Sequence, residues 1–164
     1  RTLDHVQSRI DRFLDPASGD TYQVDTALSA FSSGGLLGRG PGEGVIKAHL
    51  PDAHADFIFA VVGEEFGLVA CLVLVALFAF VVLRGFLRLQ HEEDLFRLLA
   101  AAGLLTLFGM QALINMAVSL NLLPTKGMTL PFISYGGSSL LALAAAMGMV
   151  LALTRWRARP GYMP

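Results

Sequence analysis

The chain lacks the motifs by which many soluble enzymes are recognised. Its single cysteine, Cys71, cannot form a disulfide within the chain. No histidine pair at ligand spacing on a helix accompanies it, so the sequence predicts no zinc site. The glycine-rich run 34–44 lacks the Gly-Lys-Ser/Thr ending of a P-loop and has no G-x-G-x-x-G register. Lysine and arginine form no dense basic face, and we expect no nucleic-acid partner.

Charged residues are scarce as well, at 15%, while hydrophobic residues reach 54%. The usual apolar share is about 45–50%. The excess is concentrated in three stretches, residues 57–83, 98–120 and 133–153. A membrane-spanning helix needs roughly 20 mostly apolar residues, and each stretch is long enough. The sequence therefore predicts an all-α fold, a polytopic transmembrane helical bundle, in place of one soluble domain.

The positive charges near the ends of these stretches predict an orientation. Residues 84–97 carry three arginines, and the tail 154–164 carries three more and no acid. Lysine and arginine near span ends mark the cytoplasmic side of a membrane protein. We therefore expect both segments in the cytoplasm, and residues 1–56 and 121–132 outside it.

Residues 1–56 are expected to form a large outer loop. Apolar residues recur at helical spacing within residues 1–16 and 21–31, which predicts two short amphipathic helices. They lie either along the membrane surface or against neighbouring protein. The glycine-rich run that follows is either a flexible loop or a mobile flap over a site. Since the chain opens inside this polar segment, we expect it to be part of a longer protein with earlier spans.

Four acids lie where the outer loop meets the first apolar stretch: Asp52, Asp56, Glu64 and Glu65. Asp52 follows Pro51 and suits the first turn of a helix. Ionisable residues within a span usually face the bundle interior or a water-filled cavity, so Glu64 and Glu65 are expected to pair with other helices. Asp56 lies at the mouth, where both water and a lipid-linked substrate reach it, and it is our candidate for chemistry.

His54 stands between two of these acids in the sequence. An extended strand could present Asp52, His54 and Asp56 to a metal ion, but on a helix the three side chains do not converge. We therefore favour an interfacial hydrogen-bonding role for His54 over a metal site.

The second apolar stretch carries Gln111, Asn115 and Ser119, each four positions apart on one helix face. In hydrocarbon such side chains hydrogen-bond to other helices, or else they line a polar cavity. Beyond them, Pro124 and Pro131 break any helix. Backbone broken at membrane depth is tolerated only where protein or water covers it, so we expect the loop to fold back into the outer mouth of the bundle.

Two residues of this returning loop are candidates. Lys126 has three open roles: capping a helix end, snorkelling to the surface, or holding an anionic phosphate. Ser134 begins a serine- and glycine-rich run, where serines more often serve packing and backbone hydrogen bonds than chemistry.

Two long motifs together resemble the SEDS family (shape, elongation, division and sporulation) of bacterial membrane proteins. They are LPDAHADFIFAVVGEEFG from Leu50 and LPTKGMTLPFISYGGSSLL from Leu123. The run from Tyr22 to Gly44 fits the family's large outer loop, and the Pro-Thr-Lys-Gly sequence is closer to the division branch than to the elongation branch. The resemblance implies that these are the last three spans of a ten-span fold. Two positions depart from the family pattern, Ala48 in place of a glutamate and Ala55 in place of a threonine.

The resemblance implies a peptidoglycan glycosyltransferase of the bacterial inner membrane, acting at the division septum. Its substrate would be lipid II, the undecaprenyl-pyrophosphoryl disaccharide-pentapeptide. The family's essential aspartate falls on Asp56 and its loop lysine on Lys126. We expect Asp56 to act as general base and Lys126 to contact pyrophosphate. Further tentative substrate contacts are His54, Lys47, Glu64 and Ser134.

The resemblance also implies partners, namely membrane lipids, a class B penicillin-binding transpeptidase and other division proteins. A Mg²⁺ or Mn²⁺ ion would suit pyrophosphate chemistry, although the sequence shows no ligand set for it. No organic cofactor is expected.

Two other functions remain open for these features, a lipid II flippase and a non-catalytic division scaffold. A flippase also uses acids within the membrane and broken helices. It needs polar residues reachable from both sides, however, whereas Asp52, Asp56 and Lys126 are all expected on the outer side. A scaffold would tolerate substitution of Asp56.

Overall fold

The computed structural model describes residues 22–44, 57–124 and 127–155. These residues form four α-helices and no strand, which confirms the predicted all-α fold. The helices are α2 (Tyr22–Gly34), α3 (Ile58–Leu89), α4 (Leu95–Ser119) and α5 (Gly137–Leu153). α2 covers the second predicted amphipathic segment, whereas the first, residues 1–16, lies outside the described residues.

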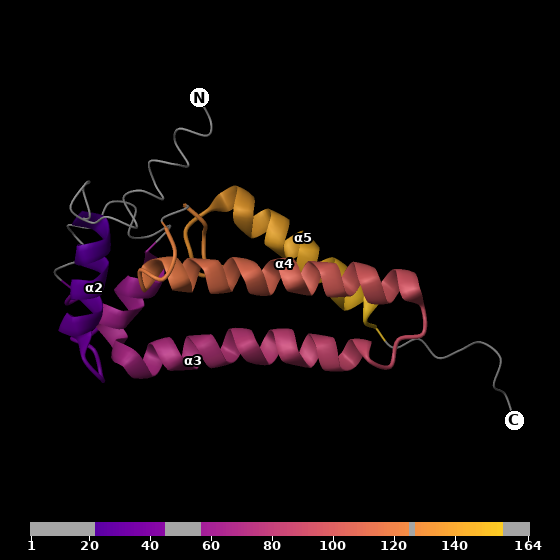
Figure 1. Cartoon of the computed structure of the whole chain (residues 1–164), viewed down its shortest axis with the longest axis horizontal. Coiled ribbons are helices and arrows are strands. Elements are labelled where there is room, and N and C mark those ends of the chain that lie inside the picture. Colours follow the sequence, from indigo (N-terminus) through magenta and orange to yellow (C-terminus); the bar gives the residue numbers. More distant parts are fainter. Residues whose placement is uncertain (1–21, 45–56, 125–126, 156–164) are drawn as a thin grey trace, which may run out of the picture.

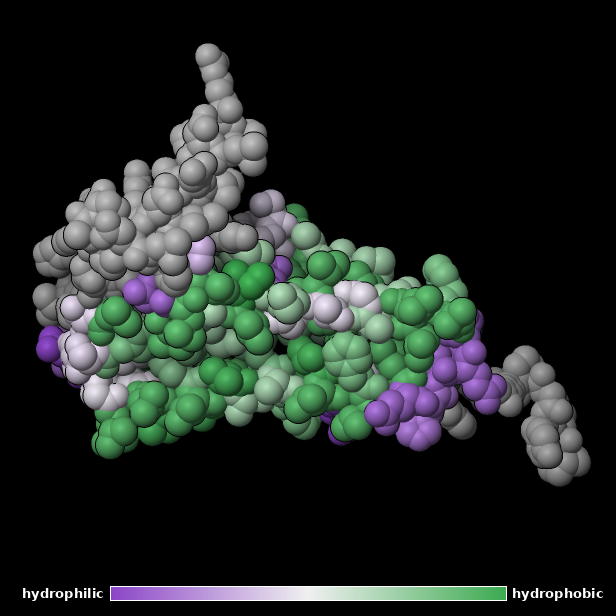
Figure 2. Space-filling model, viewed as in Figure 1, coloured by the Kyte–Doolittle hydropathy of each residue, from purple (hydrophilic) through white to green (hydrophobic). Residues whose placement is uncertain are grey.

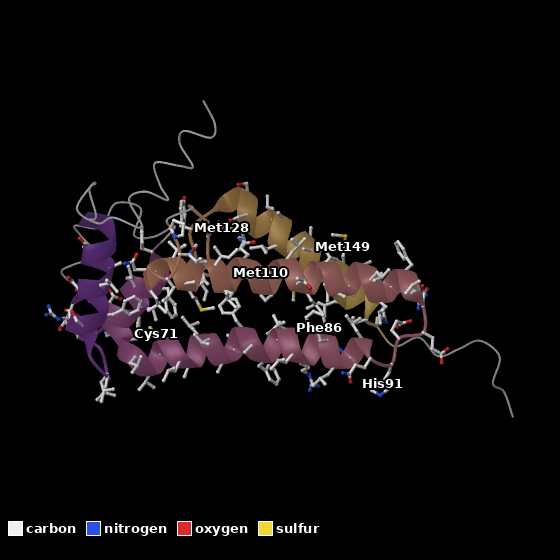
Figure 3. All side chains as sticks on the ribbon, viewed as in Figure 1. Cys71, Phe86, His91, Met110, Met128 and Met149 are labelled. Carbon is white, nitrogen blue, oxygen red and sulfur yellow. The ribbon has the colours of Figure 1, made fainter. Side chains whose placement is uncertain are left out.

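α3 and α4 run antiparallel and side by side, α5 crosses α4, and α2 stands across one end (Figure 1). We call this the α2 end. It also holds the loop after α2, the start of α3, the end of α4 and the loop that leads into α5. The opposite end carries the α3–α4 connection, with His91 labelled there in Figure 3. All described segments next to the candidate residues therefore gather at the α2 end.

α3 and α4 are long and apolar enough to cross a membrane, and α5 is a shorter apolar helix of 17 residues. Many apolar side chains on these helices are exposed, and the visible face is mostly hydrophobic apart from the α3–α4 connection and the α2 end (Figure 2). A helix that is apolar on nearly every side is suited to hydrocarbon or to further helices. The predicted membrane boundaries stay predictions.

Buried residues form three clusters along the bundle. The cluster at the α2 end joins α2, α3 and α4, the middle cluster adds α5 and the returning loop, and the third lies near the α3–α4 connection. Their buried members are Ala27, Ala30, Phe57, Ala60, Val61 and Val118; Phe78, Phe108, Ala112, Leu130 and Leu143; and Leu89, Ala101, Leu105 and Val150. α2 is thus packed on protein through small residues, one of the two alternatives left open for this helix.

α3 is interrupted at Gly67, whose backbone angles, φ 77° and ψ −174°, are not helical. The first turns, residues 58–66, consequently leave the axis of the long part of the helix and approach α2 (Figure 1). This conformation is essentially restricted to glycine. No break within residues 57–83 is predicted from the apolar pattern, which is continuous across Gly67.

Candidate functional site

Four of the six candidate residues, Asp56, Lys126, His54 and Lys47, lie outside the described residues. Their roles stay predictions. The other two, Glu64 and Ser134, are described, and so are the segments that flank Asp56 and Lys126 in the sequence.

The residue that directly follows Asp56 is fixed in the core. Phe57 is 3% exposed and packs in the cluster at the α2 end, where α4 contributes Val118. Its carbonyl accepts hydrogen bonds from the amides of Ala60 (2.9 Å) and Val61 (3.2 Å), which start α3. The chain is therefore held in place immediately after Asp56.

Glu64 is fully buried, one turn before the break in α3. A Cβ placed on Gly44 would lie 2.9 Å from Glu64 Oε2, so the end of the glycine-rich loop lies directly against this carboxylate. The expected inward orientation of Glu64 is confirmed. Its contact with substrate stays a prediction.

The loop after α2 is docked on α3 at the break. Backbone hydrogen bonds run from Leu68 to Gly35 (3.0 Å), from Arg39 to Glu64 (3.0 Å) and from Gly40 to Glu65 (3.0 Å). A fourth runs from the Val69 amide to the Leu36 carbonyl (3.3 Å). In this structure the glycine-rich run is thus hydrogen-bonded to the first part of α3 through its backbone.

The polar face of α4 holds the returning loop. Gln111 donates from Nε2 to the Thr129 carbonyl at 3.0 Å and to its hydroxyl at 3.3 Å, and Asn115 donates from Nδ2 to the Met128 carbonyl. Figure 3 shows Met128 at the end of the bundle where α4 ends. The partners of these amides are loop carbonyls, where the sequence predicted other helices. They hold the chain just after Lys126.

Beyond these bonds the returning loop is buried and tightly turned. Leu130 is 1% exposed and belongs to the middle cluster, which confirms that this part of the loop folds back into the bundle. The Ser134 hydroxyl accepts from the Leu130 amide at 2.7 Å, and the Ser134 amide donates to the Leu130 carbonyl at 3.0 Å. Ser134 therefore closes a turn, and its contact with substrate stays a prediction.

A groove of about 710 Å³ opens between the start of α3 and the returning loop. Its walls are Ile58 on α3, residues 132–137 of the loop and the start of α5, and Leu140. These side chains are mostly apolar. Ile58 lies two residues after Asp56 in the sequence, and the groove offers room for an apolar ligand.

A metal centre is not formed by the described residues, which contain no group of three or more His, Cys, Asp or Glu side chains suited to an ion. The alternative ligands Asp52, His54 and Asp56 lie outside them. The divalent cation stays a prediction.

Comparisons with known proteins agree with this architecture. Two relatives are probable peptidoglycan glycosyltransferases FtsW. The one from Caulobacter vibrioides is 57% identical over 159 residues, covering 97% of this chain and 40% of the relative. The one from Geobacter metallireducens is 45% identical over 163 residues, covering 96% and 44%. The chain thus spans less than half the length of the relatives it matches.

A solved structure superimposes with a TM-score of 0.72 at 31% identity, covering 93% of this chain and 42% of the other. That structure is described as showing the structural coordination of polymerization and crosslinking by a peptidoglycan synthase complex. The family of FtsW, RodA and SpoVE, described as cell cycle proteins, matches residues 2–159. The resemblance to the SEDS family is confirmed, and the chain belongs to this family of cell cycle proteins.

Proposed function

We propose that the full-length protein that carries this chain is a peptidoglycan glycosyltransferase, which polymerises lipid II into glycan strands during septal wall synthesis. The names of its relatives support this proposal. The observation that carries it furthest is the groove at the α2 end, because it joins the start of α3 to the returning loop. These are the two segments that flank Asp56 and Lys126 in the sequence.

In the proposed reaction, Asp56 removes the proton from the 4-hydroxyl of the acceptor GlcNAc. The oxygen then attacks the anomeric carbon of the donor sugar, the bond to pyrophosphate breaks, and the pyrophosphate leaves on its lipid. One displacement on an α-linked donor gives a β-linked product with inversion, so no covalent intermediate is needed. Lys126 stabilises the negative charge that develops on the departing pyrophosphate.

The remaining candidates complete the proposed site. His54 and Lys47 contact the sugar or phosphate groups, while Glu64 and Ser134 support the two segments that line the groove. The lipid chain of the substrate approaches along the apolar groove walls. A Mg²⁺ or Mn²⁺ ion at the pyrophosphate remains part of the proposal, and no step above depends on it.

The same relatives support a proposal for the partner and the location. The helices and the family support a protein of the bacterial inner membrane. Because the solved neighbour belongs to a peptidoglycan synthase complex, we propose a class B penicillin-binding transpeptidase as partner, with other division proteins at the septum.

The test of the proposed base is Asp56→Asn in the purified full-length protein, with lipid II as substrate. General-base catalysis contributes roughly 10²–10⁴-fold, so polymerisation should fall by at least about 100-fold. Asp52→Asn is the matched control, because it removes an acid four residues away and should leave the rate within about 3-fold. Normal polymer length and rate from Asp56→Asn would rule out the base role and favour a scaffold.

A lipid II flippase is the second candidate, and the break in α3 is the observation that favours it, since transporters use discontinuous helices. In this structure the backbone groups freed at the break are bound by the loop after α2. Liposomes with lipid II confined to the inner leaflet separate the two functions. Translocation without polymer would support the flippase, whereas polymer from lipid II supplied on the outer leaflet supports the transferase.

A further inference from the structure

We infer that residues 35–40, docked on α3, act as a positioning element that aligns the start of α3, and with it Asp56, for the reaction. Gly38 and Gly67 are its positioning residues. The inference rests on the proposed role of Asp56 and adds what sets the direction of the helix start that follows Asp56 in the sequence.

The docked loop replaces two hydrogen bonds that the break removes from α3. In a continuous helix the amides of Leu68 and Val69 would donate to the carbonyls of Glu64 and Glu65, four residues back. Here these amides donate to the carbonyls of Gly35 and Leu36 instead. The loop thus pairs the two amides that the break leaves without a helical partner, as hydrocarbon surroundings require.

The loop also pairs the two carbonyls, those of Glu64 and Glu65, that the break leaves without a helical donor. Arg39 donates to Glu64 and Gly40 donates to Glu65, both at 3.0 Å. The loop is itself closed by the Gly38 amide, which donates to the Gly34 carbonyl at 2.8 Å. The direction of residues 58–66 is thus set by the shape of this loop.

Two glycines meet where the loop enters the break. Gly38 has φ +81°, and a Cβ there would lie 2.2 Å from the Glu65 carbonyl oxygen. Gly67 has φ +77°, and a Cβ there would lie 2.4 Å from the Gly38 amide nitrogen. Neither position accepts a side chain unless the loop and the helix start move apart.

Residues 58–66 act as a short arm between the break and Asp56. Nine residues of helix are roughly 13 Å long, so a rotation of about 5° at the break moves the far end by about 1 Å. Phe31 on α2 packs against this arm, with its ring 5.7 Å from that of Phe59 and close to Gly63. A misplacement of about 1 Å can cost a reaction about 100-fold in rate.

The test compares Gly38→Ala with Gly42→Ala in the full-length protein. Gly42 lies in the same loop with φ +85°, but nothing lies within 4 Å of a Cβ there, so this control carries the same backbone strain without touching α3. Gly38→Ala should lower kcat for lipid II polymerisation by about 100-fold while KM changes less than about 2-fold. Equal kcat values for the two variants would overturn the inference.

A second measurement covers the case in which Gly38→Ala does not fold. In the unaltered protein, hydrogen exchange at the amides of Arg39 and Gly40 should be slowed by at least about 100-fold relative to an unstructured chain, because both donate to α3. Exchange at the unstructured rate would show that the loop is not held on the helix, and would overturn the inference.

A double variant shows whether the loop acts through Asp56. If it does, adding Gly38→Ala to Asp56→Asn lowers the residual rate by less than about 2-fold. A further loss of about 100-fold in the double variant would show that the loop acts elsewhere. Full activity of Asp56→Asn alone would instead refute the proposed base, and the comparison of Gly38→Ala with Gly42→Ala would still decide whether the loop aligns the start of α3.

Discussion

Single side chains fix the path of the backbone at the α2 end. Asn115 is 1% exposed and donates to the Met128 carbonyl, two residues after Lys126. Gln111 does the same for Thr129, and Ser134 closes the turn that follows. A buried carbonyl left without a donor costs about 1–3 kcal/mol, so these polar residues determine where the returning loop can lie.

At this scale we predict that Asn115→Leu, which keeps the branched shape of the side chain but removes its hydrogen-bond donor, loosens the returning loop. The free energy of unfolding should fall by about 1–3 kcal/mol, and amides of residues 127–134 should exchange faster with solvent. Thermal unfolding and hydrogen exchange of the full-length protein in detergent measure both effects.

Thr106→Val is the control for this prediction. The Thr106 hydroxyl donates to the Ala102 carbonyl within the same helix, at 2.8 Å and on an exposed face. Its loss should change stability by less than about 0.5 kcal/mol. If Asn115→Leu left exchange in residues 127–134 unchanged, another contact would be holding the loop.

The sequence located these polar residues but not their partners. The spacing of Gln111 and Asn115 correctly predicted one polar face on α4. Spacing alone does not tell which backbone carbonyls lie outside a helix and need another donor. Those of Met128 and Thr129 do, because the chain turns through prolines on both sides. Asp56 and Lys126 were singled out by chemistry and by motif, and their geometry lies outside the described residues.

Between elements, glycines set how closely α3 and α4 approach. A Cβ on Gly85 of α3 would lie 2.6 Å from Leu105 Cδ1, and a Cβ on Gly109 of α4 would lie 3.1 Å from Val82 Cγ2. The Leu105 side chain thus packs directly on Gly85, and the Val82 side chain packs on Gly109. Small residues at such contacts allow close packing of helices in membranes, where no hydrophobic effect drives them together.

We predict that Gly85→Val separates α3 from α4 near their connection. Leu105 is 1% exposed and belongs to the buried cluster near the connection, so overpacking should cost about 1–3 kcal/mol. The matched control is Gly103→Val on α4, where nothing lies within 4 Å of a Cβ. Its effect on the midpoint of thermal unfolding should be small, and a midpoint lowered equally by both variants would refute the packing role of Gly85.

Helix positions were predicted well where local pattern decides them, and poorly where tertiary contacts do. The apolar stretches 57–83 and 98–120 correspond to α3 and α4. α5, in contrast, begins at Gly137, four residues after the predicted stretch starts, because Ser134 and Leu130 bind each other in a turn. The break at Gly67 depends on a loop more than 25 residues earlier in the chain, which no apolar periodicity encodes.

Across the whole molecule, the described residues separate two polar ends by an apolar body (Figure 2). Glu43 belongs to the α2 end and His91 to the α3–α4 connection, and both residues are exposed. The arginines of residues 84–97 predict that the connection is cytoplasmic. With helices that cross the bilayer, the same prediction puts the α2 end outside the cytoplasm, where glycan strands are made in the proposed function.

This orientation is tested by single cysteines introduced into the full-length protein after Cys71 and any other native cysteine have been replaced by alanine. A membrane-impermeant maleimide added to intact spheroplasts should label Glu43→Cys, because the predicted orientation puts this exposed position in the outer solution. His91→Cys should react only after the membrane is opened with detergent. Cys71 itself is buried, so this residue should remain unlabelled in the folded protein. The reverse pattern at the two new cysteines would place the α2 end in the cytoplasm, and Asp56 could then not act on a substrate outside it.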